Sequence, residues 1–91
     1  MADTLRFVPD YVSPAGETLE DVLEERRMSQ AELAARTGLS RKAINEIVKG
    51  KAPISPDTAL QLDRLFGIPA RFWNARERAY RERLARREQP T

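Results

Sequence analysis

The sequence contains neither cysteine nor histidine in its 91 residues. It therefore has no thiolate nucleophile, no disulfide, no zinc site of the usual kind and no imidazole that acts as a general base. The sequence also has no glycine-rich phosphate loop, no paired nucleophile and base, and no set of metal ligands. These absences predict a protein that is not an enzyme and that binds no cofactor and no metal.

Long apolar runs are absent as well, including from the first residues, MADTLRFVPDYV. No segment has the length of a signal peptide or a membrane span, so we expect a cytoplasmic protein with no membrane partner. A chain of this length is the size of one domain. Because such a small domain buries only about two thirds of the surface of its unfolded chain, oligomerisation would help to stabilise it.

The net charge is only +2, but the charges are unevenly distributed. Residues 1–28 carry three basic and seven acidic side chains, whereas residues 29–51 carry five basic and two acidic ones. Residues 71–91 carry seven basic and three acidic side chains. The two basic segments indicate an anionic partner. For the last segment the alternative is a solvated helix face, stabilised by pairs four residues apart such as Glu77 and Arg81.

Hydrophobic periodicity and capping residues predict an all-α fold of five helices with a long C-terminal helix. Ser29, Ser40 and Ser55 are each expected to cap a helix, with Glu32 completing a capping box on the first of these. We expect residues 1–15 to form an N-terminal arm and residues 16–88 to form the domain. The expected helices span about residues 16–27, 30–37, 41–49, 56–66 and 69–87.

The segment Ser29–Lys51 is predicted to be a helix-turn-helix, two short helices joined by a tight Gly-Leu-Ser turn. At about 100° per residue, the apolar side chains of its second helix gather on one side, and Lys42, Glu46 and Lys49 point away from them. Basic, amide and short apolar side chains on such a face match the base edges of the DNA major groove. The candidates for base contacts are Arg41, Lys42, Ala43, Asn45 and Glu46. The candidates for phosphate contacts are Gln30, Ser40, Lys49 and Lys51.

The last expected helix carries large apolar residues among many arginines. We expect Phe72 to close the core of the monomer. Trp73, Tyr80 and Leu84 form a second stripe that is too large for so small a core, so we expect them to form a homodimer contact. A symmetric dimer would place two recognition helices about one turn of double-stranded DNA apart, as a palindromic operator requires.

The stretch SQAELAARTGLSRKAINEIVKGK resembles the helix-turn-helix of the Xre family, which includes the phage repressors and Cro proteins. The flanking SPAGETLEDVLEERRMSQAELA and KGKAPISPDTALQLDRLFGIPARFWNARERAY resemble the HigA-type (VapI-type) antitoxins of bacterial toxin–antitoxin modules. This similarity covers about residues 11–84. By position, the phosphate-contacting glutamine of the Xre family falls on Gln30, and its base-contacting positions fall on residues 41–43 and 46, with Asn45 nearby.

The resemblance implies a lambda-repressor-like domain and a homodimer that binds a palindromic operator and represses its own operon. It also implies neutralisation of a HigB-like toxin, an mRNA-cleaving endoribonuclease of the RelE type. Apolar residues in the arm need a packing site or a partner, so we expect them to bind this toxin. They are Leu5, Phe7, Val8 and Tyr11. Two alternatives remain open, a stand-alone Xre-family repressor without a toxin and a toxin-binding module with little DNA binding.

Overall fold

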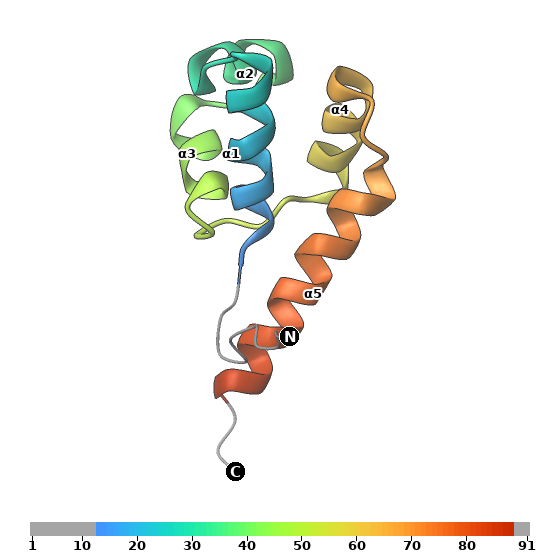
Figure 1. Cartoon of the computed structure of the whole chain (residues 1–91). Helices are drawn as coiled ribbons and strands as arrows, with labels where there is room; N and C mark the ends of the chain where they lie inside the picture. Colours follow the sequence, from blue (N-terminus) through green and yellow to red (C-terminus); the bar gives the residue numbers. More distant parts are fainter. Residues whose placement is uncertain (1–12, 89–91) are drawn as a thin grey trace, which may run out of the picture.

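The computed structural model describes residues 13–88, which form five helices and no strand (Figure 1). The predicted all-α fold is therefore confirmed over these residues. None of the five helices is long and apolar enough to cross a membrane. The helices are α1 (Ala15–Arg26), α2 (Gln30–Thr37), α3 (Arg41–Val48), α4 (Pro56–Phe66) and α5 (Ala70–Glu88).

Serine residues begin three of the helices, as the sequence predicts. The side chains of Ser29, Ser40 and Ser55 each accept a hydrogen bond from the backbone N–H three residues further along the chain. Each bond satisfies one of the N–H groups that a helix start leaves unpaired. The expected capping box of α2 is wrong, however, because the Glu32 carboxylate accepts from Arg36 at 3.0 Å instead.

Residues in the left-handed conformation mark the ends of α1, α2 and α4. Gly38 after α2 and Gly67 after α4 have φ angles of 79° and 76°, which glycine adopts without a steric penalty. The helix expected over residues 16–27 ends one residue early, because Arg27 itself takes a left-handed φ of 57°. These turns fix the short connections from α1 to α2, from α2 to α3 and from α4 to α5.

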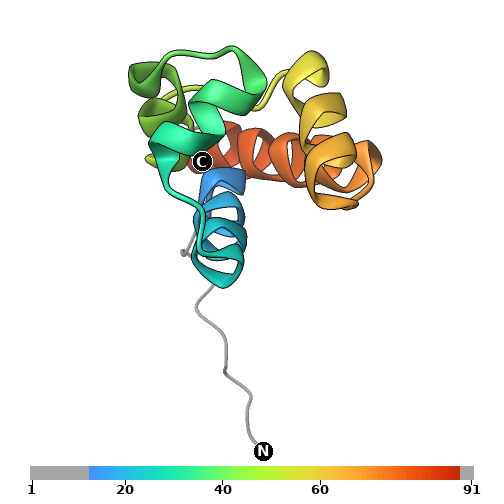
Figure 2. The same cartoon turned by 90° about the horizontal axis from the view of Figure 1, so that it is seen from above.

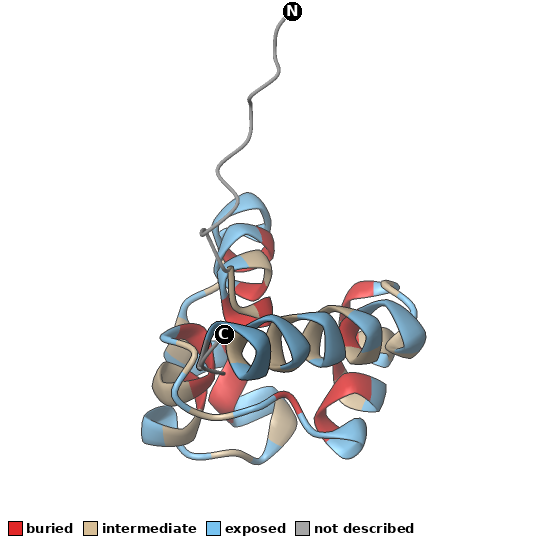
Figure 3. Cartoon of the chain, turned by 90° about the horizontal axis from the view of Figure 1, so that it is seen from below, coloured by how far each residue is buried: buried red, intermediate tan, exposed pale blue. Residues whose placement is uncertain are grey.

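Five large apolar residues in the core have almost no exposed surface. They come from α1, α2, α3, α4 and α5, so every helix contributes to a single core (Figure 3). They are Leu19, Leu33, Ile44, Leu62 and Trp73. α1 packs against both α3 and α5, while α2 packs on α3 and α4 packs on α5. Figure 1 shows α5 running beyond the other helices, so its last turns have no helix beside them. Figure 2 shows from above how α5 leads from α4 toward α1.

The structure places Trp73, and not Phe72, in the core. Trp73 is 0% exposed in the monomer, whereas Phe72 is 40% exposed and touches the indole ring edge-on. Neighbouring residues on a helix differ by about 100°, so only one of these two rings faces the core. The Asp63 carboxylate accepts a hydrogen bond from the Ala70 N–H at 2.9 Å, which fixes the first turn of α5 and therefore its rotation. The prediction that Trp73 forms a dimer contact is thus wrong.

The far ends of α1 and α4 are joined by one arginine. Arg26 donates to the backbone oxygen of Phe66 at 2.9 Å, and its guanidinium lies 5.3 Å from the centre of the Phe66 ring. The hydrogen bond satisfies a carbonyl that the end of α4 leaves unpaired, and the ring contact adds a cation–π interaction. This contact connects the helix-turn-helix side of the molecule to the α4–α5 side.

Candidate nucleic-acid interface

The core fixes α3 by one side of the helix. Ile44, Ile47 and Val48 are between 1% and 8% exposed, as the periodicity predicts. α3 packs against both α1 and α2, so two neighbouring helices hold it from its inner side. The fold therefore presents the outward face of α3 as a rigid surface.

The outward face of α3 carries most of the predicted base-contacting side chains. Arg41 and Lys42 are exposed in the first turn, and Ala43, Asn45 and Glu46 are partly exposed. The first turn of this helix contains no acidic residue. Because the recognition helix of a helix-turn-helix contacts bases mainly through its N-terminal residues, these two cations occupy suitable positions.

A hydrogen bond joins two of the predicted contact residues. Asn45 of α3 donates through Nδ2 to Oε1 of Gln30, the first residue of α2, at 3.4 Å. Asn45 is a candidate for base contact and Gln30 for phosphate contact. This hydrogen bond between two side-chain amides orients both side chains before any ligand binds. It leaves the NH₂ group of Gln30 free to donate. Both residues keep partly exposed surface.

The turn after α3 places further basic residues at the same surface. The backbone N–H groups of Lys51 and Ala52 both donate to the Glu46 carbonyl, at 2.9 and 3.1 Å. Gly50 has a φ of 81°, which allows the chain to reverse here. Lys49 and Lys51 flank this glycine in the sequence, and both are exposed. Ser40, at the other end of α3, is exposed while its hydroxyl caps the helix.

The residues predicted to form the dimer contact have little exposed surface with which to contact a second chain. Tyr80 and Leu84 are partly buried. The Tyr80 hydroxyl lies 3.3 Å from the position that a Cβ at Gly50 would occupy, and the Arg81 guanidinium lies 4.8 Å from the centre of its ring. Tyr80 therefore packs in part within its own monomer. The predicted toxin-binding residues Leu5, Phe7, Val8 and Tyr11 lie outside the described residues.

One contact near the interface differs from what the sequence indicates. Glu77 pairs with Arg81 as expected, but its other oxygen accepts from the backbone N–H of Ile54 at 3.0 Å. The segment after α3 is thereby bound to α5, a contact that no pattern in the sequence announces. Within residues 13–88 there is no group of three acidic side chains that could hold a metal ion.

Comparison with known proteins places this geometry in a family. A helix-turn-helix family model matches residues 19–73. Virulence-associated protein I of Dichelobacter nodosus is 38% identical over 74 residues, which cover 80% of this chain and 68% of that protein. The chain belongs to the HigA-type (VapI-type) antitoxins with an Xre-type helix-turn-helix.

Solved structures of similar proteins have the same fold. The antitoxin HigA of Pseudomonas aeruginosa, solved with the higBA promoter, has a TM-score of 0.78 and 34% identity, covering 82% of this chain and 83% of that one. The Pseudomonas aeruginosa protein PA4674, solved with its 18-bp operator DNA, has a TM-score of 0.78 and 32% identity, covering 88% and 89%.

Archaeal regulators match only in part. A protein of Pyrococcus furiosus named as an HTH-type transcriptional regulator is 36% identical over 59 residues, which cover 65% of this chain. The chain spans only 19% of the length of that protein.

Proposed function

We propose that this protein is the antitoxin of a type II toxin–antitoxin module. It binds a palindromic operator as a homodimer, represses its own operon and neutralises a RelE-like HigB toxin that cleaves mRNA. The observation that carries the DNA-binding part is the outward face of α3, where Arg41 and Lys42 are exposed and Asn45 is oriented by Gln30. The related HigA of Pseudomonas aeruginosa, solved with the higBA promoter, supports it.

In this proposal α3 enters the major groove as the recognition helix. Arg41 and Lys42 donate to guanine, Asn45 pairs with adenine and Ala43 touches a thymine methyl group. Glu46 accepts from cytosine or orients a neighbouring cation. Gln30, Ser40, Lys49 and Lys51 contact phosphates, which position the helix but carry no sequence information.

The homodimer in this proposal forms through the end of α5. Leu84 is the last apolar residue of the predicted stripe and lies near the end of α5, a helix that runs beyond the others (Figure 1). With Trp73 in the monomer core and Tyr80 packed near Gly50, Leu84 carries most of the expected contact. A two-fold axis through this helix presents two recognition helices to the two halves of a palindrome.

Two alanine variants separate base contact from phosphate contact. Arg41→Ala should weaken operator binding by about 5- to 150-fold, because a good contact to guanine contributes about 1–3 kcal/mol of discrimination. It should also lower the ratio of operator to random-DNA affinity. Lys51→Ala should weaken both affinities alike and reduce the slope of log affinity against log salt by about 1.

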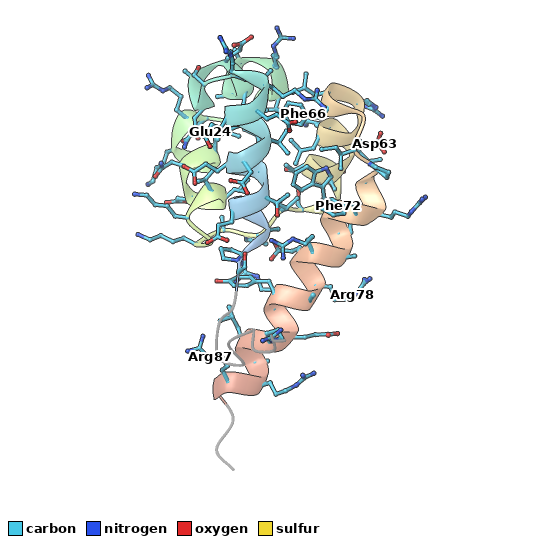
Figure 4. All side chains as sticks on the ribbon, in the orientation of Figure 1. Glu24, Asp63, Phe66, Phe72, Arg78 and Arg87 are labelled. Atoms are coloured by element: carbon cyan, nitrogen blue, oxygen red, sulfur yellow. The ribbon has the colours of Figure 1, made fainter. Side chains whose placement is uncertain are left out.

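The matched control is Arg78→Ala, which removes an exposed arginine of α5 that points away from α1 (Figure 4). It should leave operator affinity and the ratio unchanged. The binding is measured by fluorescence anisotropy over a salt series. If Arg41→Ala and Lys51→Ala behave alike, or if Arg78→Ala weakens binding as much as they do, the assignment of α3 as the recognition helix is wrong.

The toxin-binding part of the proposal concerns the arm. Deleting residues 1–12 should abolish toxin binding and leave operator affinity unchanged, because the described helix-turn-helix begins after them. The test is co-purification of the truncated and full-length chains with a RelE-like protein encoded beside the gene. Retention of the toxin by the truncated chain would place the contact elsewhere.

A stand-alone repressor is the second candidate, favoured by the similarity to the HTH-type transcriptional regulator of Pyrococcus furiosus. It predicts the same response to Arg41→Ala and Lys51→Ala. It differs in that no neighbouring gene product binds the chain and none arrests growth when expressed alone. Co-expression of the neighbouring gene with and without this chain therefore distinguishes the two candidates.

A further inference from the structure

The first turn of α1 is wedged between the end of α3 and α5. A Cβ added at Gly16 would lie 1.9 Å from the Ile47 backbone oxygen, so the backbones of α1 and α3 are in close contact. Just before this turn, Pro14 lies against Gly50, whose added Cβ would be 2.9 Å from the Pro14 Cβ. The end of α3 and the turn after it therefore rest directly on the beginning of α1.

One arginine of α5 binds the same turn from the other side. Arg76 donates through Nε and Nη2 to the Thr18 hydroxyl at 3.2 and 2.9 Å. The same guanidinium donates to the backbone oxygens of Pro14 at 3.2 Å and Ser13 at 3.4 Å. Arg76 is partly buried, so these bonds are shielded from water and are stronger than those of an exposed arginine.

The neighbouring residue provides a second point of attachment. Glu77 accepts from the Ile54 N–H at 3.0 Å, which binds α5 to the segment between α3 and α4. Arg76 and Glu77 thus attach the middle of α5 to two different segments, the start of α1 and the chain after α3. α5 packs on α1, and α1 packs on α3. The angle between α5 and α3 therefore depends on how both helices pack against the first turn of α1.

We propose that Arg76 is a positioning residue that sets the distance between the two DNA half-sites that the dimer accepts. This inference rests on the proposed binding of a palindromic operator by a dimer formed through α5. In such a dimer, the angle between α5 and α3 fixes how far apart the two recognition helices lie. One inserted base pair moves the second half-site by about 3.4 Å and rotates it by about 35°. A rigid dimer tolerates that change only by distorting the DNA.

The experiment measures affinity for a palindrome selected from random DNA, and for duplexes in which its centre is lengthened or shortened by one base pair. A single half-site serves as a further probe. The variants are Arg76→Ala and Thr18→Val, which remove the donor and the acceptor of the same contact. Arg78→Ala is the control, because this exposed arginine lies one half-turn along the same helix and points away from α1 (Figure 4).

For the wild-type chain and Arg78→Ala, one base pair of altered spacing should weaken binding by at least about tenfold, because the DNA must deform. For Arg76→Ala and Thr18→Val the loss should be no more than about threefold, since the protein adapts in place of the DNA. Affinity for the single half-site should stay within about twofold of wild type in every variant, because α3 itself is unchanged. A merely structural role would lower all affinities together.

The two hypotheses fail in different ways. Dimeric Arg76→Ala and Thr18→Val proteins that keep the full tenfold discrimination overturn the inference alone. A wild-type chain that is monomeric in sedimentation, or that binds all spacings equally, overturns the proposed dimeric binding and this inference with it. If Arg76→Ala loses its helical circular dichroism, Thr18→Val alone decides the outcome, because it replaces one partly buried side chain by another of the same shape.

Discussion

Replacing Gly16 with alanine tests the contact between α1 and the end of α3. Gly16 lies inside α1, where alanine is favoured over glycine by at most about 1 kcal/mol. Helix propensity alone therefore predicts a more stable protein. The structure predicts the opposite, because the new Cβ would lie 1.9 Å from the Ile47 oxygen and 2.7 Å from the Val48 Cα.

The size of the effect follows from what must move. Both contacts are to backbone atoms, so no change of side-chain rotamer relieves them. A carbon and an oxygen normally approach to about 3.3 Å, so α1 and α3 must separate by roughly 1 Å or more. A gap of that size forfeits a quarter to a half of the dispersion energy of the surrounding contacts, and overpacking a core costs about 1–3 kcal/mol. Because only backbone can move, we expect a cost at the upper end of this range, about 3 kcal/mol. Less the gain in propensity of about 1 kcal/mol, the net loss is about 2 kcal/mol, or about 8–16 °C in Tm.

The assay is urea unfolding followed by the fluorescence of Trp73, the sole tryptophan, which is fully buried. The control is Gly67→Ala, where no atom lies within 4 Å of the added Cβ and only the φ of 76° opposes the change. The control should lose about 1 kcal/mol, the cost of the left-handed conformation. A Gly16→Ala protein as stable as wild type, or a control that loses more, would refute the close contact between α1 and α3.

Three further predictions concern the core, a helix cap and the proposed dimer. Trp73→Ala should lower the free energy of unfolding by about 3–5 kcal/mol. Phe72→Ala should lower it by less than half as much, since the Phe72 ring is 40% exposed. Equal losses of stability in thermal melts of the two variants would contradict the core described above. Ser40→Ala should cost about 1 kcal/mol and speed amide hydrogen exchange in the first turn of α3, because it removes the cap from the Ala43 N–H. Leu84→Asp should yield a folded monomer in sedimentation equilibrium at micromolar concentration, and a persistent dimer would exclude the end of α5 as the interface.

Local signals in the sequence were sufficient for the helices. A serine side chain caps a helix through an N–H three residues away, and a glycine ends one through its own φ angle. Neither depends on the rest of the fold, and so Ser29, Ser40 and Ser55 cap the helices that they were expected to cap. Where a signal depended on a longer side chain it failed, because Glu32 had a nearby cation, Arg36, to pair with.

The outward face of α3 was also predictable, because a helix that buries Ile44, Ile47 and Val48 must turn its other side to solvent. The hydrogen bond between Gln30 and Asn45 was not, since it spans two helices. Each of the two residues was a candidate because of the chemistry of its own side chain alone. Only the packing of α2 on α3 brings the two amides together.

The sequence by itself thus determined the five helices, their caps and the polar face of α3, all of which depend on residues within a few positions of one another. The tertiary structure decided which of the adjacent rings Phe72 and Trp73 fills the core, because Asp63 fixes the rotation of α5. It also selected Arg76 from seven arginines in residues 71–91 to hold the start of α1. Nothing in the order of residues distinguishes that arginine, because its partners lie about sixty positions away and meet it only after the chain has folded.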